Sequence, residues 1–192
     1  MVIGITGGTG CGKSTVSKIL SEKLSAPIID ADKIAHSAWT VEEILTKLCE
    51  FLGDDILIDG KEVDRRKVSA IVFNDSSKLQ KLNSIIHPYV MNEIEKQVQS
   101  FSETCSYVIL DVPLPNKQFF EISDYVVTVW ASLDTRIERL KKRTGLREEA
   151  ILARINKQMS EEEYAEIANI VIYNDGTLED LQDSLDELIK KI

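Results

Sequence analysis

Residues 1–20 read MVIGITGGTGCGKSTVSKIL, and this stretch decides the fold. Its apolar run at 2–6 predicts a short buried strand. Residues 7–14, GGTGCGKS, match the phosphate-loop pattern G-x-x-x-x-G-K-[ST] in full. Apolar residues at helical spacing follow, at Val16, Ile19, Leu20 and Leu24. Strand, glycine loop and helix in this order are the context that the pattern requires.

The residue types in this loop suit a triphosphate. Glycines let successive backbone N–H groups turn inward as an anion nest, and the helix N-terminus adds partial positive charge. Lys13 would reach the β- and γ-phosphates, and the Ser14 hydroxyl would bind Mg²⁺. Cys11 has two interpretations: a thiol with a pKa lowered by the helix N-terminus, or a small residue tolerated at a variable position. The loop therefore predicts binding of a nucleoside triphosphate.

The rest of the chain alternates strand-like and helical patterns. Continuous apolar runs recur at 2–6, 26–30, 107–112, 125–131 and 170–173. Such an alternation predicts an α/β fold, with a parallel sheet buried between helices on both faces. A C-terminal amphipathic helix is expected to begin after Thr177, a suitable N-cap, and to pack on the core.

Two segments interrupt this pattern. Residues 33–104 contain helical patterns and no good strand, which indicates a helical insertion at the ligand-binding edge of the sheet. Six cations then fall within twelve residues of an acidic chain: Arg136, Arg139, Lys141, Lys142, Arg143 and Arg147. A phosphoryl-transfer enzyme needs a mobile cationic lid, whereas a solvated basic helix face is the alternative.

Three carboxylates follow predicted strands. Asp30 and Asp32 end the second strand, and Asp32 is our candidate for the base that accepts the proton of an alcohol acceptor. Asp30 suits an N-cap or an outer Mg²⁺ contact, and both residues could simply cap the next helix. Asp111 ends the strand at 107–112, where a carboxylate would hold Mg²⁺ through water or serve only as a strand end.

Composition excludes several classes of protein. The 192-residue chain has a net charge of −9, which argues against nucleic acid or an anionic membrane as its main partner. No apolar run is long enough to span a bilayer, and no secretory signal is present. The three cysteines show no metal or disulfide spacing, so we expect free thiols and a cytoplasmic protein. The residues set no oligomeric state, and a monomer fits them.

The chain resembles the dephospho-coenzyme A kinase family over nearly its whole length. The resemblance rests on GITGGTGCGKST, IIDADKIAH, DRRKVSAIVF with LNSIIHPYV, LDVPL, and ARINKQMSEEEYAEIANIVIYNDG. It implies ATP-dependent phosphorylation of the ribose 3′-hydroxyl of dephospho-coenzyme A, the last step of coenzyme A synthesis. It also implies a P-loop three-layer α/β/α fold with a five-stranded parallel sheet, a core at 1–32 and 105–192, a coenzyme-binding helical insertion at 33–104, and a lid at 136–165.

The resemblance assigns roles by position. Those for the nucleotide are Gly8, Gly10, Cys11, Gly12, Lys13, Ser14, Thr15, Arg139 and Asn174. Those for the acceptor are Thr6, Asp32, Arg65, His87, Pro113 and Leu114, with His87 alternatively a structural, helix-breaking residue before Pro88. Lys13, Asp32 and the lid residue Arg143 would act in catalysis, and Ser14 and Asp111 would hold Mg²⁺.

The sequence departs from the family pattern at four places, which are His36, Pro115–Asn116, Thr144 and Asn169. The first two fall on the acceptor side. A kinase of another small alcohol or nucleotide is therefore one alternative, and a nucleotide-binding protein without catalysis is another. A guanine-reading Asn-Lys-x-Asp is absent from the sequence, because residues 115–118, PNKQ, lack the final aspartate.

Overall fold

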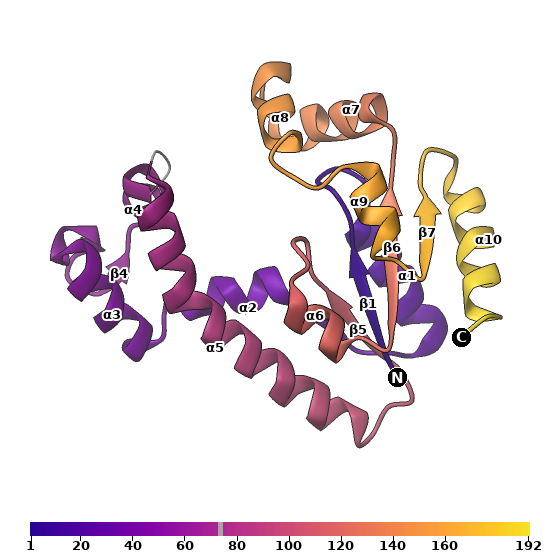
Figure 1. Cartoon of the computed structure of the whole chain (residues 1–192), viewed down its shortest axis with the longest axis horizontal. Helices are drawn as coiled ribbons and strands as arrows, with labels where there is room; N and C mark the ends of the chain where they lie inside the picture. The colour runs from indigo at the N-terminus through magenta and orange to yellow at the C-terminus, as the bar shows by residue number, and fades with distance from the viewer. Residues whose placement is uncertain (73–74) are drawn as a thin grey trace. The chain divides into compact units, whose positions relative to one another are not determined.

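The computed structural model describes residues 1–72 and 75–192 and divides into two compact units (Figure 1). The first unit comprises Met1–Asp30 and Val98–Ile192, and the second comprises Ala31–Gln97. Phe73, the last residue of the segment DRRKVSAIVF, lies outside the described residues.

The first unit is built on a five-stranded parallel sheet, as the sequence predicts. Its strands lie in the order β2-β5-β1-β6-β7 and all pair in parallel. They are β1 (Val2–Thr6), β2 (Ile28–Asp30), β5 (Val108–Asp111), β6 (Tyr125–Trp130) and β7 (Ile170–Tyr173). The central strand β1 is buried along its whole length, so the loop that follows it leaves from the middle of the sheet.

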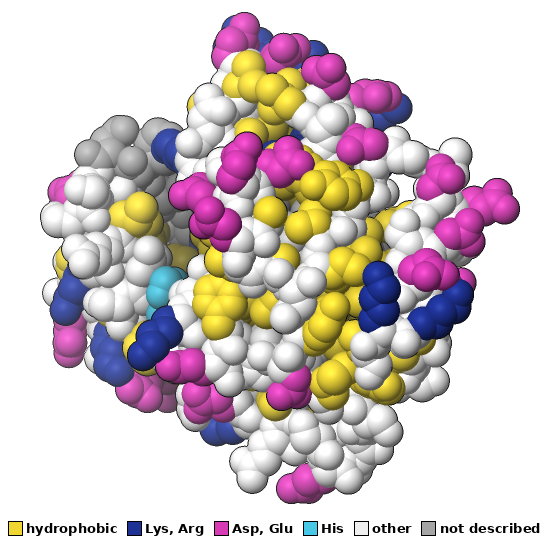
Figure 2. All heavy atoms as spheres, turned by 45° about the vertical axis from the view of Figure 1, so that its right-hand side comes forward, with side chains coloured by type: hydrophobic (Ala, Val, Ile, Leu, Met, Phe, Trp, Pro, Cys, Tyr) yellow, Lys and Arg dark blue, Asp and Glu magenta, His cyan; other side chains and the backbone are white. Residues whose placement is uncertain are grey.

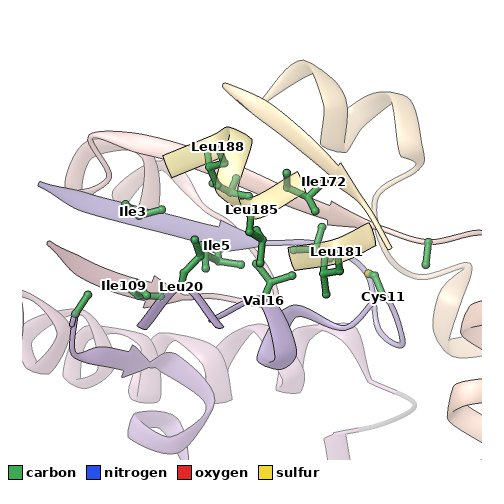
Figure 3. Close-up of a cluster of buried hydrophobic side chains, with 14 residues drawn as sticks. Ile3, Ile5, Cys11, Val16, Leu20, Ile109, Ile172, Leu181, Leu185 and Leu188 are labelled. Carbon is green, nitrogen blue, oxygen red and sulfur yellow. The ribbon is translucent and has the colours of Figure 1, made fainter. Parts of the chain in front are cut away.

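Two helices cover one face of this sheet: α1 (Lys13–Leu24) and α10 (Leu178–Ile189). Their apolar faces meet the side chains of β1, β5 and β7 in a buried cluster (Figure 3). Thr177 caps α10 in a capping box with Asp180, which confirms the predicted helix start. The cluster also contains Cys11, so the glycine loop is anchored in the core.

The opposite face carries α6 (Lys117–Ile122) and α9 (Glu161–Glu166). Gly4 on β1 lies under α6, where a Cβ would meet the Ser123 Oγ at 2.3 Å and the Phe119 ring at 2.7 Å. A side chain at this position would collide with the helix, so glycine allows the close packing. The fully buried Tyr164 anchors α9 in the same layer.

Helices α7 (Leu133–Thr144) and α8 (Glu148–Ile155) lie beyond the carboxyl ends of the strands (Figure 1). They form a small cluster of their own from Leu140, Ile151 and Ile155, with Ile137 and Leu146 packed against it. Ser132 caps α7 and is held in turn by Asp175, which accepts from the Ser132 N at 2.9 Å and from its Oγ at 2.7 Å. Helices α7 and α8 therefore have their own apolar contacts, and Asp175 holds the N-terminus of α7 in place.

The second unit is mainly helical, as the sequence predicts for this region. Its elements are α2 (Ala31–Ala38), α3 (Glu42–Leu52), a 3₁₀ turn (Asp54–Ile56), β3 (Leu57–Ile58), β4 (Glu62–Val63), α4 (Arg65–Val72) and most of α5 (Ser76–Ser102). The small antiparallel hairpin of β3 and β4 contradicts our expectation of no strand between 33 and 104. Its turn is made by Asp59 and Gly60, both at positive φ.

Helix α5 runs through Pro88, so the interpretation of His87 as a helix-breaking residue is wrong. Proline cannot donate to the carbonyl of Ser84 four residues earlier. The helix nevertheless continues on both sides because buried Leu82, Ile86, Val90 and Ile94 pack as one face.

Among the described residues, no helix is both long and apolar enough to cross a membrane. Acidic side chains are spread over the face of the molecule seen in Figure 2, in line with the net charge of −9.

Candidate active site

The loop between β1 and α1 has the backbone of an anion nest. Gly7, Gly10 and Gly12 have φ of 139°, 86° and 94°, values that side-chain-bearing residues rarely adopt. Helix α1 begins at Lys13, directly after the loop, and the Thr15 N–H donates to the Gly12 carbonyl at 3.0 Å. The N–H groups before Thr15 belong to the helix start, which lacks acceptors one turn earlier. The Lys13 Nζ donates to the Gly7 carbonyl at 2.8 Å, across the loop. The predicted residues Gly8, Gly10, Gly12, Lys13, Ser14 and Thr15 are thus assembled in one loop and helix start.

Turning the N–H groups inward leaves carbonyls that face outward, and neighbouring side chains bind these. The Cys11 carbonyl accepts from the Asn174 Nδ2 at 2.7 Å and from the Arg139 Nη1 at 3.3 Å. Both residues were predicted to bind the nucleotide. In the structure they contact the outer side of the loop, where they hold its shape.

Two residues that the sequence analysis placed in the lid, and not at the phosphate loop, also contact the loop. Arg136 donates from Nε to the Thr9 carbonyl at 2.9 Å, and the Gln158 Oε1 accepts from the Thr9 N–H at 2.7 Å. Arg136 is 2% exposed, so it belongs neither to a solvated basic face nor to a mobile lid surface. Its position four residues before the buried Leu140 was the available signal, since residues i and i+4 share a helix face.

The Cys11 side chain is fully buried in the loop. Burial raises the pKa of its thiol, although the charges of Lys13, Arg136 and Arg139 act in the opposite direction. The thiol also donates to the Gly8 carbonyl. Of the two interpretations of Cys11, the lowered pKa is therefore wrong, and the residue acts as a small apolar anchor.

Asp111 and Asp30 pair with one another in the register of β2 and β5, at the carboxyl edge of the sheet. The Ser17 Oγ on α1 donates to the Asp111 Oδ2 at 2.8 Å, which ties this carboxylate to the helix that bears Ser14. The described residues contain no group of three or more His, Cys, Asp or Glu side chains able to hold a metal. An ion at this edge would accordingly need oxygen ligands from a bound phosphate as well.

In the second unit, Asp32 lies in the first turn of α2, two residues after the end of β2. It lines an open hollow of about 500 Å³ together with His36, Arg65, Lys33, Ser37 and Thr40. The Arg65 Nη1 contacts the His36 ring, 2.6 Å from Nδ1, and Nη2 donates to the His36 carbonyl at 3.1 Å. The Arg65 guanidinium also lies 5.7 Å from the centre of the Trp39 ring. Asp32 and Arg65 therefore line the same hollow.

His87 is exposed on α5 and does not line this hollow. A separate hollow of about 730 Å³ lies between α3 and α5 and is bordered by Pro88, Tyr89, Lys47 and Lys81 among others. The structure thus does not bring His87 together with Asp32 and Arg65.

The remaining acceptor candidates belong to the first unit. Thr6, the last residue of β1, is fully buried, and its Oγ1 has no hydrogen-bond partner among residues 1–72 and 75–192. The Pro113 carbonyl accepts from the Tyr164 hydroxyl at 3.4 Å, whereas the Leu114 side chain is 63% exposed. In the turn that follows β5, Pro113 is consequently held by a hydrogen bond, and the Leu114 side chain is exposed to solvent.

Arg143 is exposed in the last turn of α7. Its neighbours are neutralised, because Lys141 pairs with Glu148 at 2.6 Å and Lys142 with Glu138 at 2.7 Å. Within the described part of the chain, Arg143 forms no ion pair, which leaves its charge available to a ligand.

The four departures from the family pattern all have contacts in the structure. Besides the contact of His36 with Arg65, the Asn116 Oδ1 caps α6 by accepting from the Phe119 N at 2.9 Å. The Asn169 Oδ1 accepts from the Val126 N at 2.7 Å beside β6. The Thr144 Oγ1 donates to the Leu140 carbonyl at 2.8 Å. These side chains fit the fold, so the departures do not disturb the phosphate loop.

Comparison with known proteins agrees with this geometry. The model of the dephospho-CoA kinase family matches residues 1–180. A dephospho-CoA kinase of Bacillus cereus is 40% identical over all of this chain and 96% of its own length. The crystal structure of TT1252 from Thermus thermophilus has a TM-score of 0.86 at 32% identity, covering 100% of this chain and 97% of that one. The dephospho-CoA kinase from Campylobacter jejuni has a TM-score of 0.73 at 26% identity, covering 99% and 96%.

The agreement extends from the loop at the N-terminus to the last strand and includes the helical second unit. The chain therefore belongs to the dephospho-CoA kinase family.

Proposed function

We propose that this protein transfers the γ-phosphoryl group of ATP to the ribose 3′-hydroxyl of dephospho-coenzyme A, which yields coenzyme A and ADP. This is the last step of coenzyme A synthesis. The observation that carries the proposal is the match to the family over residues 1–180, combined with a complete phosphate loop between β1 and α1.

The donor side of the reaction uses the first unit. The loop N–H groups and Lys13 would bind the phosphates of ATP, with Lys13 leaving the Gly7 carbonyl for the β- and γ-phosphates. Tight packing supports this role, since a Cβ at Gly12 would lie 2.2 Å from the Asn174 Nδ2. Gly12 therefore has no side chain between its backbone and a phosphate, and the Asn174 side chain leaves no room for one.

Magnesium is part of the proposal. The Ser14 hydroxyl and the Asp111 carboxylate are hard oxygen ligands, the type that Mg²⁺ prefers. Mg²⁺ is commonly held by one or two protein side chains together with substrate phosphates. When bound, the ion would neutralise charge that develops on the phosphates.

The proposed acceptor residues are found in each unit separately. Asp32 would take the proton of the 3′-hydroxyl while its oxygen forms a bond to phosphorus and the bond to ADP breaks. Arg65 would bind an anionic part of the coenzyme precursor from the hollow that it shares with Asp32. Thr6, Pro113 and Leu114 are the further proposed acceptor residues, and within the described residues the Thr6 Oγ1 has no hydrogen-bond partner that would compete with a substrate hydroxyl. His87 is left out of this set because it does not line the hollow of Asp32 and Arg65.

Lid function is assigned to the pair of helices α7 and α8, within 136–165. Arg143 would stabilise the phosphoryl group during transfer, since it is exposed and forms no ion pair within the described residues. Arg139 would act at the same end of the nucleotide, through the loop carbonyl that it already contacts.

The substrate is a small molecule, and the acidic composition argues against nucleic acid as a partner. We also propose a cytoplasmic location, which rests on the composition and cysteine pattern alone.

A panel of acceptors tests the proposal. Release of ADP is measured by a coupled assay with Mg·ATP and, in turn, dephospho-coenzyme A, adenosine, pantetheine, shikimate and gluconate. We expect kcat/KM for dephospho-coenzyme A to exceed the others by at least about 10³-fold, because it alone presents the full set of binding groups. A preferred acceptor other than dephospho-coenzyme A would instead favour a kinase of another small alcohol or nucleotide. ATP binding without turnover of any acceptor would favour a non-catalytic protein.

A further inference from the structure

The most buried charge beside the phosphate loop is on a residue that the proposed roles count only as part of the lid. Arg136 on α7 is 2% exposed, and its guanidinium points at the back of the loop. It donates from Nε to the Thr9 carbonyl at 2.9 Å and from Nη2 to the Gln158 Oε1 at 3.3 Å. Its Cζ lies 4.8 Å from the centre of the Trp130 ring. The side chain is therefore held on three sides.

Gln158 completes a closed set of contacts around a single residue of the loop. Its Oε1 accepts from the Thr9 N–H at 2.7 Å, while Arg136 binds the carbonyl of the same residue. Gln158 lies between α8 and α9, so the contact comes from the segment that follows the α7–α8 pair. With both its N–H and its carbonyl bound, Thr9 has a fixed backbone orientation, which sets the direction of the turn that follows.

The loop and Arg136 also fit each other closely. A Cβ at Gly8 would lie 2.4 Å from the Arg136 Nη2, and one at Gly10 would lie 3.0 Å from the Arg136 carbonyl oxygen. Because Gly8 and Gly10 have no side chains, Arg136 can pack directly against the backbone of the loop. This explains glycine at position 8, whose φ alone does not require it.

The charge of Arg136 is not neutralised by an acid. None of the carboxylates in the described residues forms an ion pair with it, and its polar contacts are an amide and a carbonyl oxygen. A buried charge is screened far less than an exposed one. Its field reaches the loop, where it acts to lower the pKa of Cys11 against the effect of burial.

We propose that Arg136 is a positioning residue for the nucleotide: with Gln158 it fixes the Thr9 peptide, and its unneutralised charge lies directly behind the triphosphate site. The loop is then preorganised before ATP binds, and ATP gains attraction from a cation that never touches it. This inference rests on the proposed nucleotide site and is independent of which acceptor the enzyme uses.

The test compares Arg136→Met with Lys190→Met, a control at the end of α10, outside the proposed nucleotide, acceptor and lid residues. Both substitutions remove one cation and keep an unbranched stem, but Lys190 is exposed and pairs with Glu187 at the surface. The dissociation constant of Mg·ATP is measured by calorimetry without acceptor, and KM values for both substrates are measured by ADP release. Arg136→Met is expected to weaken ATP binding at least about tenfold, the effect of losing charge-assisted hydrogen bonds. Its KM for dephospho-coenzyme A should stay within about twofold, and Lys190→Met should change neither the ATP dissociation constant nor that KM.

Two results would overturn the inference. One is ATP binding by a folded Arg136→Met protein within about twofold of the parent, and the other is an equal rise in KM for both substrates, which a general loss of structure would cause. If Arg136→Met fails to fold, Gln158→Met tests the same contacts of the Thr9 peptide, because it removes the acceptor of the Thr9 N–H. It is expected to weaken ATP about threefold to tenfold, and unchanged ATP affinity would contradict the inference. ATP binding is measured without an acceptor. The result therefore tests Arg136 even if dephospho-coenzyme A proves not to be the substrate.

Discussion

Replacing Gly12 with alanine should destabilise the phosphate loop by an amount that the structure specifies. Gly12 has a φ of 94° and a ψ of 24°, and forcing a side-chain-bearing residue into the left-handed region costs about 1–2 kcal/mol. The new Cβ would lie 2.2 Å from the Asn174 Nδ2, which donates to the Cys11 carbonyl at 2.7 Å. Displacing this buried donor costs about 1–2 kcal/mol more, because Arg139 still contacts that carbonyl. Together the two effects give about 2–4 kcal/mol.

Two controls separate the contributions of strain and collision. Gly145 has a φ of 66° with nothing within 4 Å of its would-be Cβ, so Gly145→Ala should cost only the backbone strain, about 1–2 kcal/mol. Combining Gly12→Ala with Asn174→Ala removes the collision. The double variant should then lose about 1 kcal/mol less than the sum of the single variants, as expected for residues in contact.

The assay is urea unfolding without nucleotide, followed by circular dichroism. Without ligand, the change in the free energy of unfolding contains the strain and the collision and no loss of ATP binding. Equal effects of Gly12→Ala and Gly145→Ala, or strict additivity with Asn174→Ala, would refute the reasoning.

The other predictions concern catalysis and pH. Lys13→Ala should lower kcat/KM by at least about 10²-fold with an unchanged melting temperature, since it removes one positioned donor to the phosphates. Retained activity would contradict the role of this loop in binding the triphosphate. Asp32→Asn should lower kcat by about 10²–10⁴-fold and leave the ATP dissociation constant within about threefold, and a kcat within about tenfold of the parent would exclude Asp32 as the base. Burial raises the pKa of Tyr164 to about 12 from an ordinary value of 10. The folded state then retains a proton that the unfolded state loses, so stability should fall as pH rises from about 10 to about 12. Tyr164→Phe should flatten that decline in urea unfolding measured across this range, and an unchanged slope would contradict the shift.

The sheet and the loop were predictable because local pattern and global structure agree there. The five continuous apolar runs correspond to the five parallel strands. The motif GGTGCGKS specifies by its residue types and spacing a loop between a strand and a helix. The cap at Thr177 was likewise visible, because its signal lies within one turn of helix. These features depend on neighbours in sequence.

The missed features have other causes. The hairpin of β3 and β4 has strands of two residues each, too short for periodicity, although the Asp59–Gly60 pair was a usable turn signal. Helix α5 passes through Pro88 because packing on both sides outweighs one lost hydrogen bond.

Long-range contacts account for what was missed at the site. Arg136 and Gln158 contact a loop 127 and 149 residues away, and no local pattern specifies such partners. The same holds for Asn174 and Arg139, whose positions followed from the resemblance but whose contacts with the outer carbonyl did not. Residue type and spacing therefore identified the chemistry of the loop, and only the fold revealed what holds its shape.

The measurement that tests the central claim most directly is the identity of the product. The protein is incubated with Mg·ATP and dephospho-coenzyme A, and the acceptor is analysed by mass spectrometry and ³¹P NMR. We predict the gain of a single phosphate on the ribose 3′-oxygen, with one ADP released per product and at least about 10²-fold slower product formation by Lys13→Ala. Phosphate on any other oxygen, or unmodified dephospho-coenzyme A recovered from an enzyme that binds ATP, would contradict the account.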